Sequence, residues 1–163
     1  MGEALAKESE ALIGTWLPID ADELRPLIEQ FLLTAYENGA DVLPNEANTD
    51  RFLHMGMSWA GAGFPTLHAV IDGKICSWLA WGPAMQNFES KHPNTIHAAA
   101  SYTLPEYRSH GVQGALKQRA IEMSKELGAT RIFGPMLIDN ERGMVEMEKF
   151  GARKTHIQME LEI

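Results

Sequence analysis

The residues best suited to chemistry lie in the stretch LPEYRSHGVQGALKQRAIEMSKELGATRI, residues 104–132. A strand-like run ends in Pro-Glu-Tyr-Arg, meets two glycines three residues apart, and continues as a long amphipathic helix. The first turn of a helix carries unpaired backbone N–H groups at the positive end of its dipole. Glycines let an anion approach that main chain closely. The stretch therefore predicts a site for the phosphate or diphosphate of a cofactor.

Size and charge limit the classes of function. The chain has 163 residues, enough for one domain with a sizeable core, and a formal net charge of −8. That charge argues against nucleic acid as a partner, because phosphate backbones need a basic face. The sequence contains no run of about 18 apolar residues, so we expect no membrane span. Cys76 is the single cysteine, so we expect no intrachain disulfide, a reducing cytoplasmic setting and an inert buried thiol rather than a nucleophile.

The first half of the chain predicts two helices and a hairpin. Apolar residues recur at helical intervals in 20–37 and 46–60, with Asp20 as the N-cap of the first helix and Asn38-Gly39 at its end. A short edge strand is expected within 13–19, after a polar extension over residues 1–12. The runs TLHAVIDG and KICSWLAWG read as strands joined by Asp72-Gly73, the strongest hairpin signal in the sequence.

The second half alternates strands with helices. A loop over 83–95 leads to a strand at 95–104, and the quoted helix follows and stops at Gly128. The apolar face of that helix is expected to hold Val112, Leu116, Ala120, Met123 and Leu127. A strand in TRIFGPML, a helix from Asn140 to Phe150 and a final strand in KTHIQMELE complete the order. We therefore predict one mixed α/β domain over 13–163, with an antiparallel first half, a parallel centre and helices on both faces.

This order of elements, together with YTLPEYRSHGVQGALKQRAIEMSKELGATRI, resembles the GNAT superfamily of acetyl-CoA-dependent acetyltransferases. The family pattern here is a strand followed by Arg-x-x-Gly-x-Gly/Ala at the opening of a helix. Arg108 and Gly111 match it, Val112 takes the hydrophobic place, and Gln113 stands where Gly or Ala is usual. The segments ELGATRI and MEKFGA resemble the next strand and helix of the family. The resemblance covers roughly residues 20–160.

The resemblance implies transfer of an acetyl group from acetyl-CoA, without a metal, to a primary amine of a small molecule or peptide, by direct attack in a ternary complex. The diphosphate would lie on the main chain from Ser109 through His110, Gly111, Val112 and Gln113 to Gly114, with Arg108 beside it. The pantetheine arm would pair with main-chain groups of Tyr102, Thr103 and Leu104, and Asn140 would cap its helix close to the cofactor. The thioester would enter a splay between the two parallel strands. A second copy of the chain could pair with the edge of the short C-terminal strand, giving a homodimer.

A histidine and a serine on the strand at 95–104 are the candidates for proton transfer. His97 has an ordinary pKa near 6.5 and accepts a proton at neutral pH, and serotonin-type members of the family similarly place a histidine here. Strict alternation along a strand puts Ser101 on the same face as His97, where its hydroxyl would orient a water. The simpler interpretation is a half-buried strand histidine bonded to a neighbour and a serine that only fills the strand.

Two positions depart from the family pattern. Gln113 brings a side chain to the place where the ligand usually lies against the main chain, which weakens phosphate binding unless its amide donates to a phosphate oxygen. Many family members carry a tyrosine on the helix at 140–150 that protonates the leaving thiolate, and this chain has Met147 there. These departures support an alternative: a catalytically inactive protein of this fold with a structural, assembly or regulatory role, or one that binds CoA as a sensor.

Overall fold

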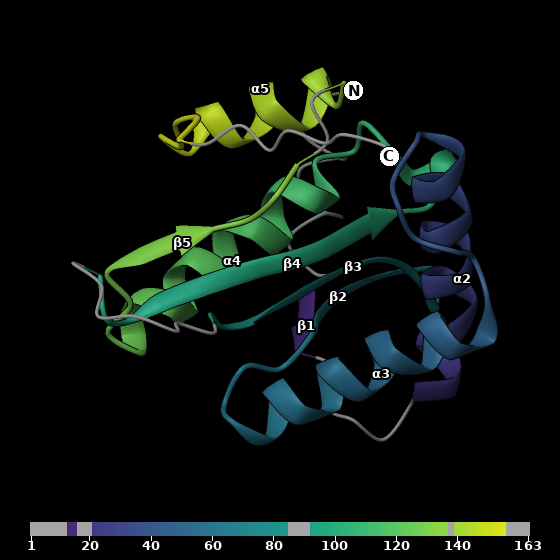
Figure 1. Ribbon diagram of the computed structural model, residues 1–163, viewed down its shortest axis with the longest axis horizontal. Coiled ribbons are helices and arrows are strands. Elements are labelled where there is room, and N and C mark those ends of the chain that lie inside the picture. The colour runs from purple at the N-terminus through teal and green to yellow at the C-terminus, as the bar shows by residue number, and fades with distance from the viewer. Residues whose placement is uncertain (1–12, 16–20, 85–91, 137–138, 156–163) are drawn as a thin grey trace, which may run out of the picture.

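Within the described residues, a sheet of five strands runs through the middle of the molecule, in the sequence order β1-β2-β3-β4-β5 (Figure 1). The computed structural model describes residues 13–15, 21–84, 92–136 and 139–155. The strands are β1 (Ile13–Thr15), β2 (Leu67–Ile71), β3 (Lys74–Pro83), β4 (Thr95–Thr103) and β5 (Arg131–Phe133). The helices are α2 (Ala21–Glu37), α3 (Glu46–Gly61), α4 (Val112–Glu126) and α5 (Glu141–Lys149), with a 3-10 turn at Pro105–Tyr107.

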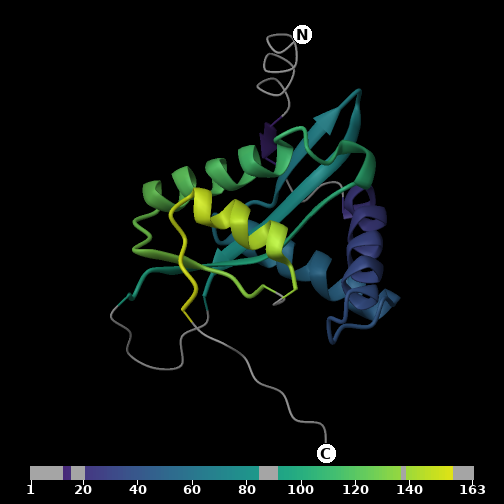
Figure 2. The same ribbon diagram turned by 90° about the horizontal axis from the view of Figure 1, so that it is seen from above.

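The directions of the strands confirm the predicted fold class. Strands β1 to β4 pair antiparallel, and β5 pairs with β4 in parallel. Helices α2 and α3 lie on one side of the sheet, and α4 and α5 lie next to each other on the other side (Figure 2). The chain is thus a single mixed α/β domain with helices on both faces.

Two hydrophobic cores hold the helices to the sheet. The core beneath α2 and α3 includes Leu24, Leu32, Leu53, Trp78 and Tyr102. The core beneath α4 includes Leu67, Leu79, Trp81, Val112 and Leu116. Strand β3 supplies large side chains to both cores and is buried along its whole interior. Because it is covered on both faces, β3 fixes the positions of the strands on either side of it.

The local signals of the first half predicted the structure well. Helix α3 runs one residue beyond the predicted 46–60, and α2 ends before Gly39, which has a φ of 83°. In the predicted hairpin, Asp72 has a φ of 51° and Gly73 a φ of 74°, as a two-residue turn of type I′ requires. These three predictions are confirmed.

Two predictions in the second half were wrong in part. The strand expected in TRIFGPML ends at Phe133, and Pro135 has no N–H with which to extend the ladder. Gly134 between them lies close to the Ala98 carbonyl, where a Cβ would sit 2.6 Å from the oxygen. Leu127 does not join the apolar face of α4. It follows the last residue of the helix and is 49% exposed.

Some predictions fall outside the described residues. They concern the extension at 1–12, the N-cap Asp20, most of the loop at 83–95 and most of the final strand in KTHIQMELE. In the parts of the chain that the structure describes, no helix combines the length and the apolar composition that crossing a bilayer requires.

The close contact between α3 and β3 predicts a large cost for one extra methyl group. The Trp59 ring lies on Gly82, so a Cβ at position 82 would be 2.3 Å from a ring carbon. We expect Gly82→Ala to lower the free energy of unfolding by about 1–3 kcal/mol, as overpacking does. Urea denaturation measures it, with Gly61→Ala on α3 as the control because nothing lies within 4 Å of that Cβ position. Equal stabilities of the two variants would contradict the contact.

Candidate functional site

The turn before α4 presents several main-chain N–H groups. Ser109 has a φ of 70° and Gly111, the N-cap of α4, a φ of 75°, and no side chain caps the helix. Within the described residues, the N–H groups of Val112, Gln113 and Gly114 have no hydrogen-bond acceptor. Nothing lies within 4 Å of a Cβ built on Gly111. The open space and the free donors together fit an anion such as a diphosphate.

Two guanidinium groups add positive charge at this turn. Arg108 donates from Nε to the Thr103 carbonyl at 3.1 Å, and its guanidinium lies 5.5 Å from the centre of the Tyr102 ring. Arg142 reaches from α5 and donates to the Ser109 hydroxyl at 3.2 Å. The His110 ring makes its contact inside the turn, with Nδ1 2.9 Å from the Arg108 carbonyl. Arg142 was missed at the sequence level, because only the packing of α5 brings it here.

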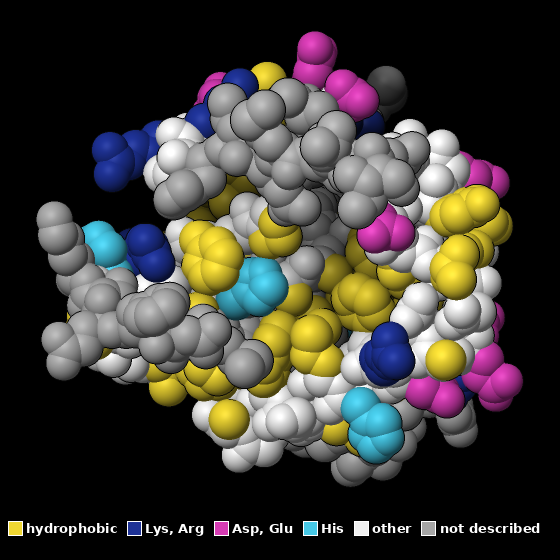
Figure 3. All heavy atoms as spheres, in the orientation of Figure 1, with side chains coloured by type: hydrophobic (Ala, Val, Ile, Leu, Met, Phe, Trp, Pro, Cys, Tyr) yellow, Lys and Arg dark blue, Asp and Glu magenta, His cyan; other side chains and the backbone are white. Residues whose placement is uncertain are grey.

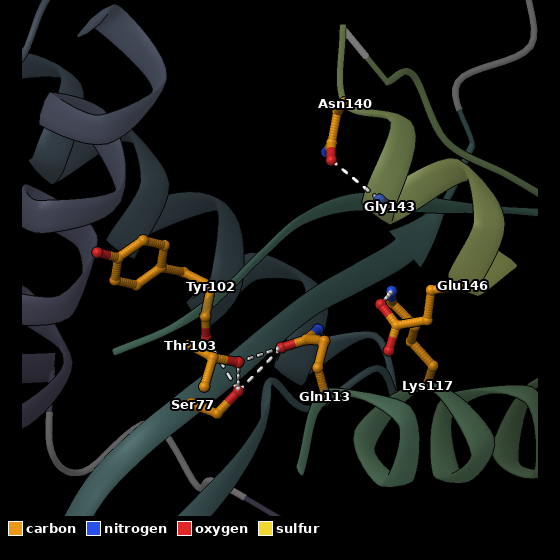
Figure 4. A network of polar contacts seen from close by, with 8 residues as sticks. All are labelled: Ser77, Tyr102, Thr103, Gln113, Lys117, Asn140, Gly143 and Glu146. Atoms are coloured by element: carbon orange, nitrogen blue, oxygen red, sulfur yellow. Dashed lines mark hydrogen bonds and ion pairs between the residues drawn. The ribbon is translucent and has the colours of Figure 1, made fainter. Parts of the chain in front are cut away.

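The side chain of Gln113 lies on the sheet side of α4 (Figure 4). Its amide contacts the Ser77 hydroxyl on β3 and the Thr103 hydroxyl on β4, both at 2.9 Å. The prediction that this side chain obstructs the ligand at the main chain was therefore wrong. Gln113 leaves the N–H groups of the turn open, and it is turned away from the place where a phosphate would lie.

Strands β4 and β5 part after a short pairing. Only Thr95 to His97 are in register with Arg131 to Phe133, and β4 continues alone to Thr103. Among the described residues, the edge of β4 beyond His97 has no strand beside it. A splay of this kind was expected from the resemblance, and it leaves main-chain groups of β4 available to a ligand.

The register of β3 and β4 shows which of these main-chain groups face the splay. The Leu104 N–H donates to the Cys76 carbonyl, and the Leu104 carbonyl accepts from the Tyr107 N–H. Hydrogen-bonded and non-hydrogen-bonded pairs alternate along an antiparallel ladder. The main-chain N–H and C=O groups of Tyr102 therefore also face β3, while those of Thr103 face away from it. The predicted pairing of a ligand with Leu104 and Tyr102 is thus corrected: Thr103 has the available N–H.

A bulge in β4 separates His97 from Ser101. Trp81 pairs with Ala98 and Ala80 pairs with Ala100, so β4 has one residue more than β3 in this region. The extra residue reverses the side-chain alternation beyond it. His97 lies on the α3 side of the sheet, whereas Ser101 is opposite Leu79 on the α4 side. The expectation that His97 and Ser101 share a face was wrong.

His97 lies between two aromatic rings. Its ring stacks on Phe133 of β5 with centroids 4.9 Å apart and meets the edge of Trp59 of α3 at 6.2 Å. Burial against these rings lowers the pKa of His97 below 6.5. Figure 3 shows this face, on which hydrophobic side chains gather over β4 and β5 and the surface is hollowed toward α2. At neutral pH the His97 ring is therefore uncharged and able to accept a proton.

Helix α5 borders the site on the α4 side. Asn140 is its N-cap, as predicted, and accepts from the Gly143 N–H at 3.0 Å (Figure 4). Glu146 of α5 accepts from the Lys117 ammonium of α4 at 2.6 Å, and the Lys117 side chain is only 11% exposed. Met147 is half-buried on the same helix. The ion pair joins α5 to α4, the helix whose preceding turn Arg142 contacts at Ser109.

In the described part of the chain, no group of three or more His, Cys, Asp or Glu side chains is arranged to hold a metal ion.

Comparisons with known proteins identify the fold. No protein-family model matches the sequence, and no curated protein matches it. A mutant of the BH1408 protein from Bacillus halodurans is similar in structure, with a TM-score of 0.74 at 16% identity over 93% of this chain and 98% of that one. The aminoglycoside N-acetyltransferase AAC(6')-Iy, solved with a bisubstrate analog of CoA, gives a TM-score of 0.69 at 12% identity over 93% and 96% of the chains. An aminoglycoside acetyltransferase from an uncultured soil metagenomic sample, HMB0005, gives 0.63 at 21% over 93% and 97%. These acetyltransferases share the GNAT fold with this chain.

The buried environment of His97 predicts how its charge responds to pH. Because its pKa in the folded protein lies below 6.5, the unfolded chain binds this proton more readily than the folded one. His97 therefore costs stability as the pH falls through 6.5 toward the folded pKa. An NMR titration of the imidazole protons, assigned with His97→Gln, should give a midpoint below 6.5. A midpoint at or above that value would contradict the burial.

Proposed function

We propose that this chain transfers an acetyl group from acetyl-CoA to a primary amine of a small molecule or peptide, by direct attack in a ternary complex. The observation that carries the proposal is that two sets of free main-chain groups, which we call the two grips, lie at one site. Free N–H groups at the start of α4 lie beside the open edge of β4, which ends at Thr103. A diphosphate fits the first grip, and the amide-bearing arm of CoA fits the second.

The known structures support CoA as the donor. AAC(6')-Iy has been solved with a CoA bisubstrate analog and with CoA itself. Identities of 12–21% to the acetyltransferases of this fold carry no information about the acceptor. We propose a small-molecule amine as the acceptor, by analogy with the aminoglycosides on which several of these proteins act, and a peptide amine is the other member of the class.

The residues of this chain fit acetyl-CoA, which when bound supplies an activated thioester. The N–H groups of Val112, Gln113 and Gly114 would donate to the diphosphate, and Arg142 would add charge from α5. The Thr103 N–H would donate to the arm, since its carbonyl is already held by Arg108. Acetyl transfer would then take place where β4 and β5 part, next to the bulge.

His97 would remove the proton from the attacking amine. It lies at the last paired position of β4 and β5, with an uncharged ring at neutral pH. A protonated amine is not a nucleophile, so a base near the thioester is needed. The hydroxyl of Ser101, which the bulge turns to the other face, has no part in this step, and Ser101 contributes through its main chain at the open edge.

One observation favours the alternative of an inactive scaffold. Helix α5 carries Met147 where a proton-donating tyrosine is common in the family, and the tyrosines of the chain are Tyr36, Tyr102 and Tyr107, all outside that helix. Calorimetry with acetyl-CoA and a thiol-release assay over a panel of amines separate the two functions. Binding without thiol release from any amine would favour a sensor or scaffold. No binding at millimolar acetyl-CoA would contradict both the enzyme and the sensor hypotheses.

The conformation of Gly111 provides a test of the diphosphate grip. Gly111 and Gly128 flank the same helix with φ values of 75° and 74°, and both have open space at the Cβ position. Alanine at either place introduces similar strain, about 1–2 kcal/mol. We expect Gly111→Ala to weaken CoA binding about tenfold, because a strained turn misplaces the donors. Gly128→Ala should lower the melting temperature alone, and calorimetry on both variants would reveal an equal effect if the turn is not the grip.

Removing the base predicts a loss of turnover. We expect His97→Gln to lower kcat about 10²- to 10⁴-fold with little change in CoA affinity, as for other general bases. The acidic limb of the wild-type pH–rate profile should lie below pH 6.5, since the pKa of His97 is lowered. Ser101→Ala should change kcat less than about threefold, given its position on the opposite face. Steady-state kinetics in which Ser101→Ala is the more damaging variant would contradict this assignment.

A further inference from the structure

A compact cluster of hydrogen bonds joins Gln113 to the two strands beneath α4 (Figure 4). The Ser77 hydroxyl lies 2.7 Å from the Thr103 hydroxyl and 3.0 Å from the Tyr102 carbonyl. One end of the Gln113 amide lies 2.9 Å from each hydroxyl. The other end is buried, has no partner among the described residues, and points away from Ser77 and Thr103.

The number of protons decides which end of the amide faces the hydroxyls. The cluster has four contacts, and the hydroxyls of Ser77 and Thr103 supply two protons. With the amide oxygen inward, two contacts lack a proton and the buried NH₂ group has no acceptor. Turning the amide by 180° exchanges its oxygen and nitrogen, leaves the other heavy atoms in place and brings two protons to the inner end. Nε2 then donates to both hydroxyls, Thr103 donates to Ser77, and Ser77 donates to the Tyr102 carbonyl.

The amide nitrogen of Gln113 therefore belongs inward, which leaves its carbonyl as the unpartnered group. A buried carbonyl without a partner is tolerated more often than a buried N–H group. In this orientation each of the four contacts carries its own proton, and one side chain ties α4 to β3 and β4 together.

The cluster connects the two grips of the proposed cofactor site. Gln113 belongs to the first turn of α4, whose N–H groups would hold the diphosphate. Thr103 is the residue whose N–H faces the open edge of β4, where the arm would lie. We propose that Gln113 is a positioning residue, which fixes the distance between these grips by donating its amide to Ser77 and Thr103. This inference rests on the proposed function, because it concerns how CoA is held.

This role differs from the two roles that the sequence suggested for Gln113. An obstructing side chain would make Gln113→Gly a gain of binding. A side chain that donates to phosphate would affect every ligand with a diphosphate. A positioning residue has a third signature: it matters for a ligand that spans both grips and has little effect on a ligand that uses only one.

Two ligands distinguish these roles by calorimetry on the purified full chain. CoA reaches both grips, whereas adenosine 3′-phosphate 5′-diphosphate has the same nucleotide and diphosphate but lacks the arm. We expect Gln113→Met to weaken CoA binding about tenfold and to change binding of the shorter ligand less than about twofold. Gln113→Gly should weaken CoA binding as much, although it restores the small residue usual in the family.

Matched variants separate positioning from stability. Gln118→Met on the exposed face of α4 is the control and should bind both ligands as the wild type does. Thr103→Val, which lacks the hydroxyl, should reproduce the loss of CoA affinity, and Thr103→Ser, which keeps it, should restore affinity to within about twofold. The double variant Gln113→Met with Thr103→Val should lose little more than either single variant, since both act through one cluster.

The outcomes that overturn the inference are distinct from those that overturn the function. Equal losses for both ligands would assign Gln113 to the diphosphate, and unchanged CoA affinity, or tighter binding by Gln113→Gly, would also overturn the inference. A wild type that does not bind CoA would overturn the proposed function and, with it, the positioning role. The amide orientation is tested without any ligand by NMR: the Gln113 side-chain NH₂ protons should show NOEs to the β protons of both Ser77 and Thr103. NOEs to neither residue would overturn the orientation.

Discussion

The early parting of β4 from β5 is the constraint on which the rest of the site depends. Strand β5 pairs with β4 over three residues only, and Pro135, two residues after its end, has no N–H with which to continue the ladder. A longer β5 would form hydrogen bonds with the main-chain groups along this edge of β4. Because β5 is short, the N–H of Thr103 stays available at the point where the chain turns into α4. The bulge at Ala98–Ala100 lies at the same level and sends the side chains on either side of it to different layers.

The sequence predicted the elements whose signals are local. The Asp72-Gly73 turn, the periodic apolar faces of α2 and α3, and the Asn140 cap need only neighbours in the chain to form. The bulge has no such signal, since three consecutive alanines fit a regular strand equally well. The assignment of Ser101 to the face of His97 was wrong for that reason, although His97 itself was placed correctly on the strand.

The same distinction between local and tertiary signals applies to the site residues. Gly111 and the free N–H groups of α4 were predictable from the sequence, because a glycine at the start of a helix indicates an accessible main chain with unpaired N–H groups. The position of Arg142 and the cluster of hydrogen bonds around Gln113 were not predictable, since they depend on the packing of α5 against α4 and of α4 on β3. The net charge of −8 gave no hint that two arginines gather at one turn. A local cluster of cations determines anion binding more than the overall charge does, because screening in salt limits charge effects to about 10 Å.

The absence of a tyrosine from α5 weighs less against catalysis than it first suggests. A thiol with an ordinary pKa near 8.5 leaves as a thiolate at pH 7 at a cost of only about 2 kcal/mol, which a proton from water can offset. A primary amine with a pKa near 10.4 must first lose a proton, and at pH 7 that costs about 4.6 kcal/mol. The larger of the two demands therefore falls on the base. In the proposed reaction His97 would be this base, and the lowered pKa that results from its burial between Trp59 and Phe133 keeps the ring unprotonated at neutral pH. Met147 removes the smaller contribution and leaves the larger one in place.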